Sequence, residues 1–258
     1  MTNKASSRSE LAGILDLIDD YFSRGFSRRR PESGVYGEEK DAGIALGDQG
    51  GHPIPGEGRG DGGDSGHVDG SGDQESRAAA LAMVAEEAAA CSRCALSMNR
   101  KRTVPGEGAI NPPVLLVGEG PGEEEDRTGR PFVGRAGQYL DTWLAPIGLE
   151  RSTCFVANCV KCRPPQNREP RPEETAACAP FLERQIEALR PRTILCLGRI
   201  AAQRILESSA SLSGLRGKVH SKQGIPVVVT YHPSAVLRDQ DLKRPVWEDL
   251  KLLKTLLG

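Results

Sequence analysis

Residues 114–126, VLLVGEGPGEEED, join a short apolar run to a glycine-rich turn that ends in four consecutive acidic residues. Three more apolar runs follow at Cys154–Ala157, Thr193–Leu197 and Val227–Thr230. Helical patterns lie between or after these runs, near 135–146, 173–189, 199–207 and 246–257. Short apolar runs that alternate with helices are typical of buried parallel strands. The sequence therefore predicts an α/β fold with three αβα layers and a central four-stranded parallel sheet.

Polar residues follow three of these strands where each one ends. The first strand runs into Gly118–Asp126, the second into Asn158, and the last into Tyr231–Ser234. Ligands of parallel α/β sheets bind beyond the carboxyl ends of the strands, so we expect the site there. The glycine-rich turn lacks a Walker lysine and its carboxylates would repel an anion, which argues against a nucleotide-phosphate site. A neutral base and a water suit this loop better, although a tight turn with a solvated acidic helix start is the simpler alternative.

The N-terminal third differs from the rest of the chain in composition. Residues 7–24 have the apolar spacing of a short amphipathic helix, which we place in a segment 1–30. Residues 31–75 hold 14 glycines in 45 residues, mixed with Asp, Ser and Glu, and are expected to be a flexible linker. The folded domain is then expected to span 76–258.

Charge and apolar content limit the class of protein. Residues 1–80 carry 9 Lys+Arg against 15 Asp+Glu, which leaves 25 against 20 in the remainder, so the C-terminal part is the basic part. A basic domain suits a polyanionic partner. Because no apolar stretch is long enough for a membrane span and no signal peptide pattern is present, we expect a cytoplasmic protein without a membrane partner.

Seven cysteines in a cytoplasmic chain favour metal binding over a disulfide framework. Cys91 and Cys94 form one CxxC pair, and Cys159 and Cys162 form a second, with Cys178 sixteen residues beyond. By spacing alone, two CxxC pairs are typical of a zinc site. Four thiolates suit zinc or an iron-sulfur cluster equally well.

Three motifs, in order, resemble those of the family 4 uracil-DNA glycosylases, the iron-sulfur branch of that superfamily. They are GEGPGEEEDRTGRPFVGRAG at 118–137, NCVKCRPPQNREP at 158–170 and TYHPSAVLR at 230–238. The resemblance covers roughly residues 80–258. It implies a uracil-DNA glycosylase-like fold and a monofunctional hydrolase that removes uracil from DNA during base excision repair, leaving an abasic site.

The resemblance assigns roles to several pocket residues. Phe132 is expected to stack on the flipped base, Gly120 to contact that base, and Asn158 to bind its Watson-Crick edge. His232 is expected to bond O2, where negative charge develops as the glycosidic bond breaks. Taken one at a time, a core phenylalanine, a strand-end asparagine and a surface histidine remain possible.

The group that activates water is open. The best-known glycosylases of the superfamily have an Asp where this sequence has Gly120. Glu119, Glu125 and Asn167 are the candidates at matching motif positions, and Asn167 needs only to orient a water. Glu125 is also a candidate for excluding thymine's methyl group, where other families have a Tyr in place of Gly122.

For the cysteines, the resemblance implies a [4Fe-4S] cluster on Cys91, Cys94, Cys162 and Cys178. Neighbours on an extended chain point oppositely, so Cys159 is expected to face away from the side to which Asn158 points. Cys154, Cys159 and Cys196 are then expected to be small core residues.

Contacts with partners complete the expectations. DNA contacts are expected from Arg163, Ser234 and Arg238, and an apolar wedge from Val236 or Leu237 is expected to fill the space of the extruded base. Residues 18–22 have the spacing of a sliding-clamp-binding peptide, but a helix that docks on its own domain is the competing interpretation. The chain is expected to be a monomer. The alternatives to the enzyme are a non-enzymatic iron-sulfur DNA-binding module associated with replication and a zinc-stabilised nucleotide hydrolase.

Overall fold

A computed structural model describes residues 70–258, which belong to one compact unit of the chain, Asp69–Gly258. The expected helix at 7–24, the clamp-binding peptide at 18–22 and the linker up to residue 69 lie outside the described residues. The first described helix, α2 (Gly70–Ala90), begins within the segment 31–75 that was expected to be a linker.

The centre of the unit is a six-stranded sheet with the order β1-β3-β2-β4-β6-β5. The four inner strands are parallel, which confirms the predicted sheet. The outer strands β1 and β5 pair antiparallel and were not expected, since they are two and three residues long and have no apolar run. The strands are β1 (Glu107–Gly108), β2 (Val114–Gly118), β3 (Phe155–Asn158), β4 (Thr193–Leu197), β5 (His220–Lys222) and β6 (Ile225–Thr230).

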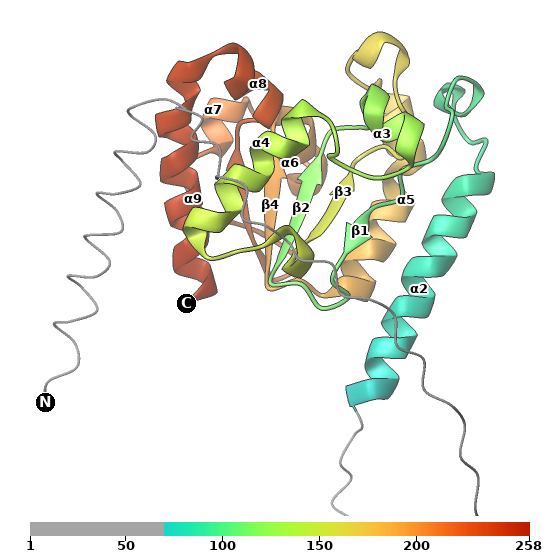
Figure 1. Cartoon of the computed structure of the whole chain (residues 1–258), viewed down its shortest axis with the longest axis horizontal. Coiled ribbons are helices and arrows are strands. Elements are labelled where there is room, and N and C mark those ends of the chain that lie inside the picture. Colours follow the sequence, from blue (N-terminus) through green and yellow to red (C-terminus); the bar gives the residue numbers. More distant parts are fainter. Residues whose placement is uncertain (1–69) are drawn as a thin grey trace, which may run out of the picture. The chain divides into compact units, whose positions relative to one another are not determined.

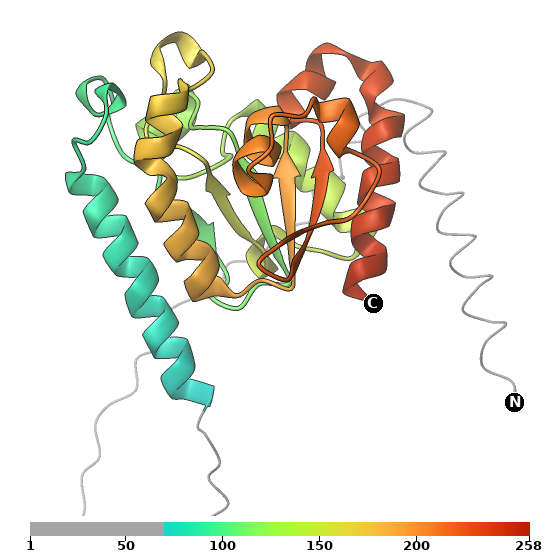
Figure 2. The ribbon, with the colours of Figure 1, turned by 180° about the vertical axis from the view of Figure 1, so that it is seen from behind.

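Helices cover both faces of the sheet, as the three-layer prediction requires. Figures 1 and 2 show α4 (Arg135–Leu144) on one face and α5 (Pro172–Leu189) with α6 (Arg199–Leu206) on the other. The helix α9 (Lys243–Leu257) packs against β6 and β4, and α2 packs along α5. The short helices are α3 (Glu123–Thr128), α7 (Leu212–Leu215), α8 (Pro233–Arg238), η1 (Ala95–Met98), η2 (Ala145–Ile147), η3 (Arg151–Thr153), η4 (Pro165–Asn167) and η5 (Gln240–Leu242).

The inner strands are apolar along most of their length because both faces of the sheet are covered. All of β2, for example, is buried. Leu115 and Val117 pack in one cluster with residues of α5 and α6, such as Ile186 and Ile205. Since side chains alternate along a strand, Leu116 between them points to the opposite face.

The register of the sheet brings the carboxyl ends of the strands together. Gly118 of β2 lies beside Asn158 of β3, and Leu197 of β4 lies beside Thr230 of β6. From β2 the chain continues to β3 on one side, and from β3 it crosses to β4 on the other side of β2. Such a reversal of strand order is the kind of switch point where α/β sheets bind ligands. No helix in residues 70–258 is both long and apolar enough to cross a membrane.

Candidate active site

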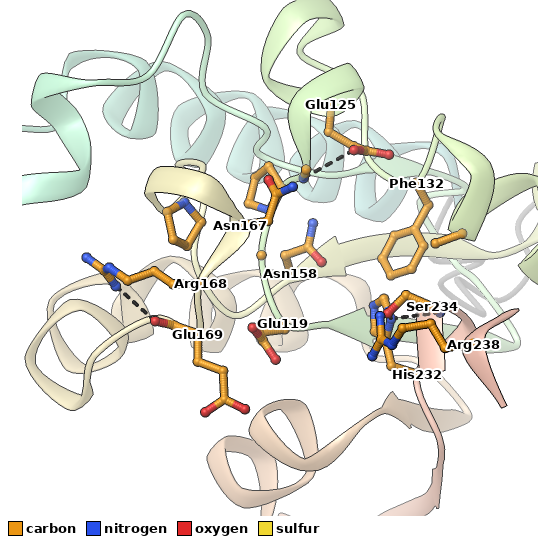
Figure 3. Close-up of a pocket in the computed structure, with 15 residues that line it drawn as sticks. Glu119, Glu125, Phe132, Asn158, Asn167, Arg168, Glu169, His232, Ser234 and Arg238 are labelled. Atoms are coloured by element: carbon orange, nitrogen blue, oxygen red, sulfur yellow. Dashed lines mark hydrogen bonds between the residues drawn. The ribbon is translucent and has the colours of Figure 1, made fainter. Parts of the chain in front are cut away.

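A cavity of about 470 Å³ lies at these strand ends (Figure 3), between the loops that follow β2, β3 and β6. Its walls contain most of the residues singled out by the sequence. Nine of them line it: Glu119, Gly120, Glu125, Phe132, Asn158, Asn167, His232, Ser234 and Arg238. Arg163, Val236 and Leu237 are not part of the lining.

Asn158 ends β3 with its side chain almost fully buried, at 1% exposure. Within residues 70–258 its Oδ1 atom has no hydrogen-bond partner. An unpaired buried acceptor costs about 1–3 kcal/mol, so this amide is poised for a ligand that donates a hydrogen bond.

Gly118 makes room for Asn158 and Phe132. A Cβ atom at Gly118 would lie 2.4 Å from Asn158 Oδ1 and 2.5 Å from Phe132 Cζ. Any larger residue there would displace the two side chains from their present positions. Sequence reasoning treated this glycine only as part of a turn, because its neighbour Asn158 is 40 positions away in the chain.

Phe132 sits in the wall with a strained backbone, at φ 52°. Its loop is held by Glu125, whose Oε1 accepts hydrogen bonds from the backbone N–H groups of Val133 and Gly134, both at 2.8 Å. Oε2 accepts from the N–H of Gly122 at 3.1 Å. With both oxygens bonded to backbone N–H groups, Glu125 is arranged to position the Phe132 loop rather than to activate a water.

His232 precedes α8 and faces the ring of Phe132, with ring centroids 5.7 Å apart. Its Nδ1 accepts the N–H of Ser234 at 3.2 Å and lies 2.8 Å from Ser234 Oγ. Because a backbone N–H can only donate, Nδ1 carries no proton. Burial, with a smaller contribution from the charge of Arg238, lowers the pKa of His232 to about 4. At neutral pH the ring is therefore uncharged, with its one N–H at Nε2.

Gly198 supports His232 from the end of β4. Its φ of 95° favours glycine, and a Cβ atom there would lie 3.1 Å from His232 Cβ. No sequence pattern indicated this contact, since Gly198 resembles an ordinary turn between a strand and a helix.

Glu119 and Asn167 are two of the candidates for the water-activating group. Within residues 70–258 their side chains form no hydrogen bond to the backbone. Burial, and then the charge of Glu169, raise the pKa of Glu119 to about 7, against a lowering by Arg199. The Oδ1 atom of Asn167 accepts a hydrogen bond from Arg163 Nε at 2.8 Å, and its φ is 56°. Glu169 was not expected in the pocket, although it lies in the second motif.

The raised pKa of Glu119 predicts a pH-dependent stability. Below about pH 4.5 the carboxyl is protonated in folded and unfolded chains alike, and its contribution to the free energy of unfolding is fully present. This contribution is lost as the pH rises from about 4.5 through about 7, because the unfolded chain ionises first. Wild-type protein should therefore lose stability relative to Glu119→Gln between these pH values. Urea unfolding of both proteins across this range measures the difference, and a constant difference would contradict the pKa assignment.

The expected DNA contacts divide into two groups. Ser234 and Arg238 line the cavity, and Arg163 reaches it through Asn167. Of the two candidates for the wedge, Val236 is fully buried in the core, whereas Leu237 is half-buried. Val236 packs inside the protein and is not placed to enter DNA, so the wedge expectation is kept for Leu237 alone.

A second, small cavity lies near the carboxyl end of α2 and is lined by Cys91, Cys94, Cys162 and Cys178. None of the seven cysteines, all of which lie within residues 70–258, forms a disulfide. Arg100 lies beside this group, with Nη1 3.4 Å from Cys162 Sγ and 2.8 Å from the carbonyl of Cys91. Residues far apart in sequence therefore bring four thiols around one space.

The other three cysteines are in the core. Cys159 and Cys196 belong to the apolar cluster beneath α5 and α6, and Cys154 is fully buried at the start of β3. The expectation that these three are core residues is confirmed by their burial. Only one member of the second CxxC pair, Cys162, lines the second cavity.

Comparison with known proteins identifies relatives of the chain. The family model of the Uracil DNA glycosylase superfamily matches residues 105–251. The type-4 uracil-DNA glycosylase of Thermotoga maritima is 43% identical over 181 residues, which are 69% of this chain and 94% of that protein. The type-4 enzymes of Sulfurisphaera tokodaii and Archaeoglobus fulgidus are 42% and 40% identical, over 68% of this chain and 84% and 92% of their own lengths.

Proposed function

Because the chain belongs to the uracil-DNA glycosylase superfamily and to its type-4 group, we propose that it hydrolyses the N-glycosidic bond of deoxyuridine in DNA. Water adds to the C1′ carbon of the sugar, the bond from C1′ to N1 breaks, and uracil leaves with the bonding electron pair. A proton from the water ends on the released base. The product is an abasic site in an uncut strand, the starting point of base excision repair.

The observation that carries this proposal is the buried, unpaired Oδ1 of Asn158 beside Phe132. Uracil offers a donor at N3 and an acceptor at O4, which one side-chain amide can bind together. Cytosine presents the reverse arrangement of donor and acceptor and would leave the amide unsatisfied. Phe132, held by Glu125 at the cavity wall, supplies the flat apolar surface on which a flipped base stacks.

His232 is suited to stabilise the leaving uracil anion. The uncharged ring has a single N–H, at Nε2, because Nδ1 accepts from Ser234. A donor fixed before the reaction and aimed at the developing negative charge on O2 lowers the barrier without reorganisation. Gly198 and Ser234 then act on the reaction by holding the ring.

We assign the attacking water to Glu119 and Asn167, because the third candidate in the cavity wall, Glu125, uses both of its oxygens to bind backbone N–H groups. Gly120 stands where other families have an Asp. A Cβ atom added at Gly120 would lie 2.8 Å from Val160 Cγ2. A side chain is therefore crowded out at this position. Gly120 itself offers its backbone surface to the base.

The four clustered cysteines support a [4Fe-4S] cluster as the resident cofactor. They line one cavity, and N–H groups lie close to three of their sulfurs, as is usual at iron-sulfur sites. Within residues 70–258 no three His, Cys, Asp or Glu side chains are arranged to hold a single metal ion. When bound, the cluster would cross-link α2, the loop after β3 and α5 through Cys91, Cys94, Cys162 and Cys178.

A lyase reaction would need a free amine in the pocket. Lys161, the lysine within the motifs, is 1% exposed, and its Nζ donates to the carbonyl of Asn158 and to Gln185 Oε1. Its amine is thus occupied, which supports a monofunctional hydrolase.

We further propose that Arg163, Ser234 and Arg238 contact the DNA backbone around the cavity, with Leu237 as the wedge. The domain is proposed to act as a monomer, and clamp binding by residues 18–22 stays a separate proposal. The proposed DNA contacts rest on the sequence motifs and on the presence of Ser234 and Arg238 in the cavity wall.

The proposed activity is tested with anaerobically purified protein and a labelled oligonucleotide that contains one deoxyuridine. We expect strand cleavage only after alkali treatment, since alkali breaks the strand at abasic sites, and no cleavage of matched thymidine or deoxycytidine oligonucleotides. Cleavage without alkali would indicate a lyase. Absence of cleavage by protein that binds the oligonucleotide would refute the enzyme in favour of a DNA-binding module.

A further inference from the structure

Lys161 links the cysteine cavity to Asn158 in the wall of the active-site cavity. It lines the cavity of the four cysteines, and its backbone N–H lies 3.2 Å from Cys178 Sγ. Its side chain turns the other way, where Nζ donates to the carbonyl oxygen of Asn158 at 2.9 Å and to Gln185 Oε1 at 2.7 Å. One residue thus contacts a thiol of the cysteine cavity and the backbone of Asn158, the base-reading residue of the active-site cavity.

The bond from Lys161 supplies a donor to the backbone carbonyl of Asn158 at the end of β3. Beyond β3 the backbone stays bonded to the loop after β2, since the N–H groups of Cys159 and Val160 donate to the carbonyls of Gly118 and Glu119. Lys161 Nζ satisfies the Asn158 carbonyl from within the same turn. Without this donor, the buried carbonyl would lose this hydrogen bond, and the end of β3 that carries the amide would be held less firmly.

Gln185 fixes the lysine in turn. Its Oε1 accepts from Lys161 Nζ, while its Nε2 donates to the carbonyl of Pro105 at 2.7 Å. Gln185 is itself buried on α5, the helix that carries Cys178. The chain of bonds from α5 to β3 is therefore continuous and shielded from water, where hydrogen bonds are strongest.

The charge of Lys161 also needs explanation. Burying an ammonium group is costly unless it is hydrogen-bonded and close to negative charge. Its two hydrogen-bond acceptors are neutral, a carbonyl and an amide, whereas the neighbouring cysteines would carry negative charge as ligands of a cluster. The residue therefore fits a loaded cysteine site better than an empty one.

We infer that Lys161 is a positioning residue, which holds the amide of Asn158 in its base-reading orientation and makes that orientation depend on the cysteine site. This inference rests on the proposed function. It deepens that function, because the hydrogen bonds of Lys161 connect the cysteine site to the residue that recognises uracil.

A double-mutant cycle tests the link. Single-turnover uracil release is measured for wild type, Lys161→Met, Asn158→Ala and the double variant, each normalised to iron-loaded protein. Lys161→Met should slow release about tenfold, a coupling of ordinary size between residues in contact, and should add less than about twofold in the Asn158→Ala background. Losses that multiply in the double variant would show that Lys161 acts independently of Asn158, and would overturn the inference.

Lys222→Met is the matched control. Lys222 is also buried, but it pairs with Glu207 and Glu183, away from the cavity. Its loss should lower stability and leave release per folded molecule unchanged. An equal slowing by Lys222→Met would reduce the role of Lys161 to general stability and refute its positioning role.

Two further readouts separate the inference from its premises. Amide hydrogen exchange in 156–162 should accelerate in Lys161→Met and not in Lys222→Met, and unchanged exchange would count against the inference. Iron content should survive in Lys161→Met, since the side chain bonds no sulfur; complete iron loss would make it a cluster-holding residue instead. No uracil release by wild type would refute the proposed function itself, before any variant is compared.

Discussion

Replacing His232 by alanine should lower the rate of uracil release by about 10²–10³-fold, the loss typical when one fixed donor to a developing anion is removed. The reason lies in the preparation of the ring. Ser234 occupies Nδ1, and the depressed pKa, about 4, keeps the ring uncharged at neutral pH, so its Nε2–H is available in essentially every molecule. The donor acts on charge that exists only in the transition state, so DNA affinity should change little.

The measurement is single-turnover release beside an equilibrium binding titration with the same oligonucleotide. His220→Ala is a suitable control, because His220 lies on the edge strand β5 and its ring bonds the carbonyl of Leu215. Because the pKa of Glu119 is itself about 7, the pH profile is measured in Glu119→Gln, in which release should show no titration of a histidine near pH 6.5. A loss in affinity as large as the loss in rate would mean that His232 binds DNA rather than the transition state.

The central sheet was predictable because its signal is local. Each inner strand is a run of apolar residues, such as Val114–Gly118, and both of its faces are covered. The edge strands were missed because a polar run such as His220–Lys222 pairs through its backbone and has no apolar pattern. Pairing across a sheet is decided by neighbours that the linear sequence does not show.

The candidate site was predictable in its membership and less so in its roles. The sequence motifs predicted that Phe132, Asn158 and His232 share one site, and all three line one cavity. The same positions left Glu125 among the water-activating candidates, whereas its oxygens bond the backbone N–H groups that carry Phe132. Which atoms a carboxylate meets depends on how the loop folds back on itself, and a motif alone does not contain that information.

The wedge shows the same limit. Val236 and Leu237 are equivalent in sequence as an apolar pair at a helix start. The turn of α8 places the first in the core and leaves the second half-buried. One residue of helical rotation, about 100°, separates the two environments. Helical phase in so short a helix is set by tertiary contacts rather than by a repeating apolar pattern.

Replacing Cys162 by alanine should remove most of the bound iron and lower Tm by about 10 °C or more. Ligand bonds are part of the folding free energy when the metal site forms only in the folded chain. For a domain of roughly this size, each 1 kcal/mol lost shifts Tm by about 2–4 °C. The cysteine cavity is lined by residues at the end of α2, in the loop after β3 and on α5, so the loss should be felt in all three.

Cys159→Ala is the control that makes this result specific. Cys159 and Cys162 lie in one motif and are both buried, at 1% and 6% exposure, but Cys159 packs under α5 and α6 rather than around the cysteine cavity. Its replacement removes one small buried atom and should keep full iron content, with a modest fall in Tm. Equal iron loss from both variants would show that the second CxxC pair binds as a unit. Zinc in place of iron in the wild type would show that the cysteine site binds a different metal and would contradict the proposed cluster. The predictions for the uracil pocket would still stand.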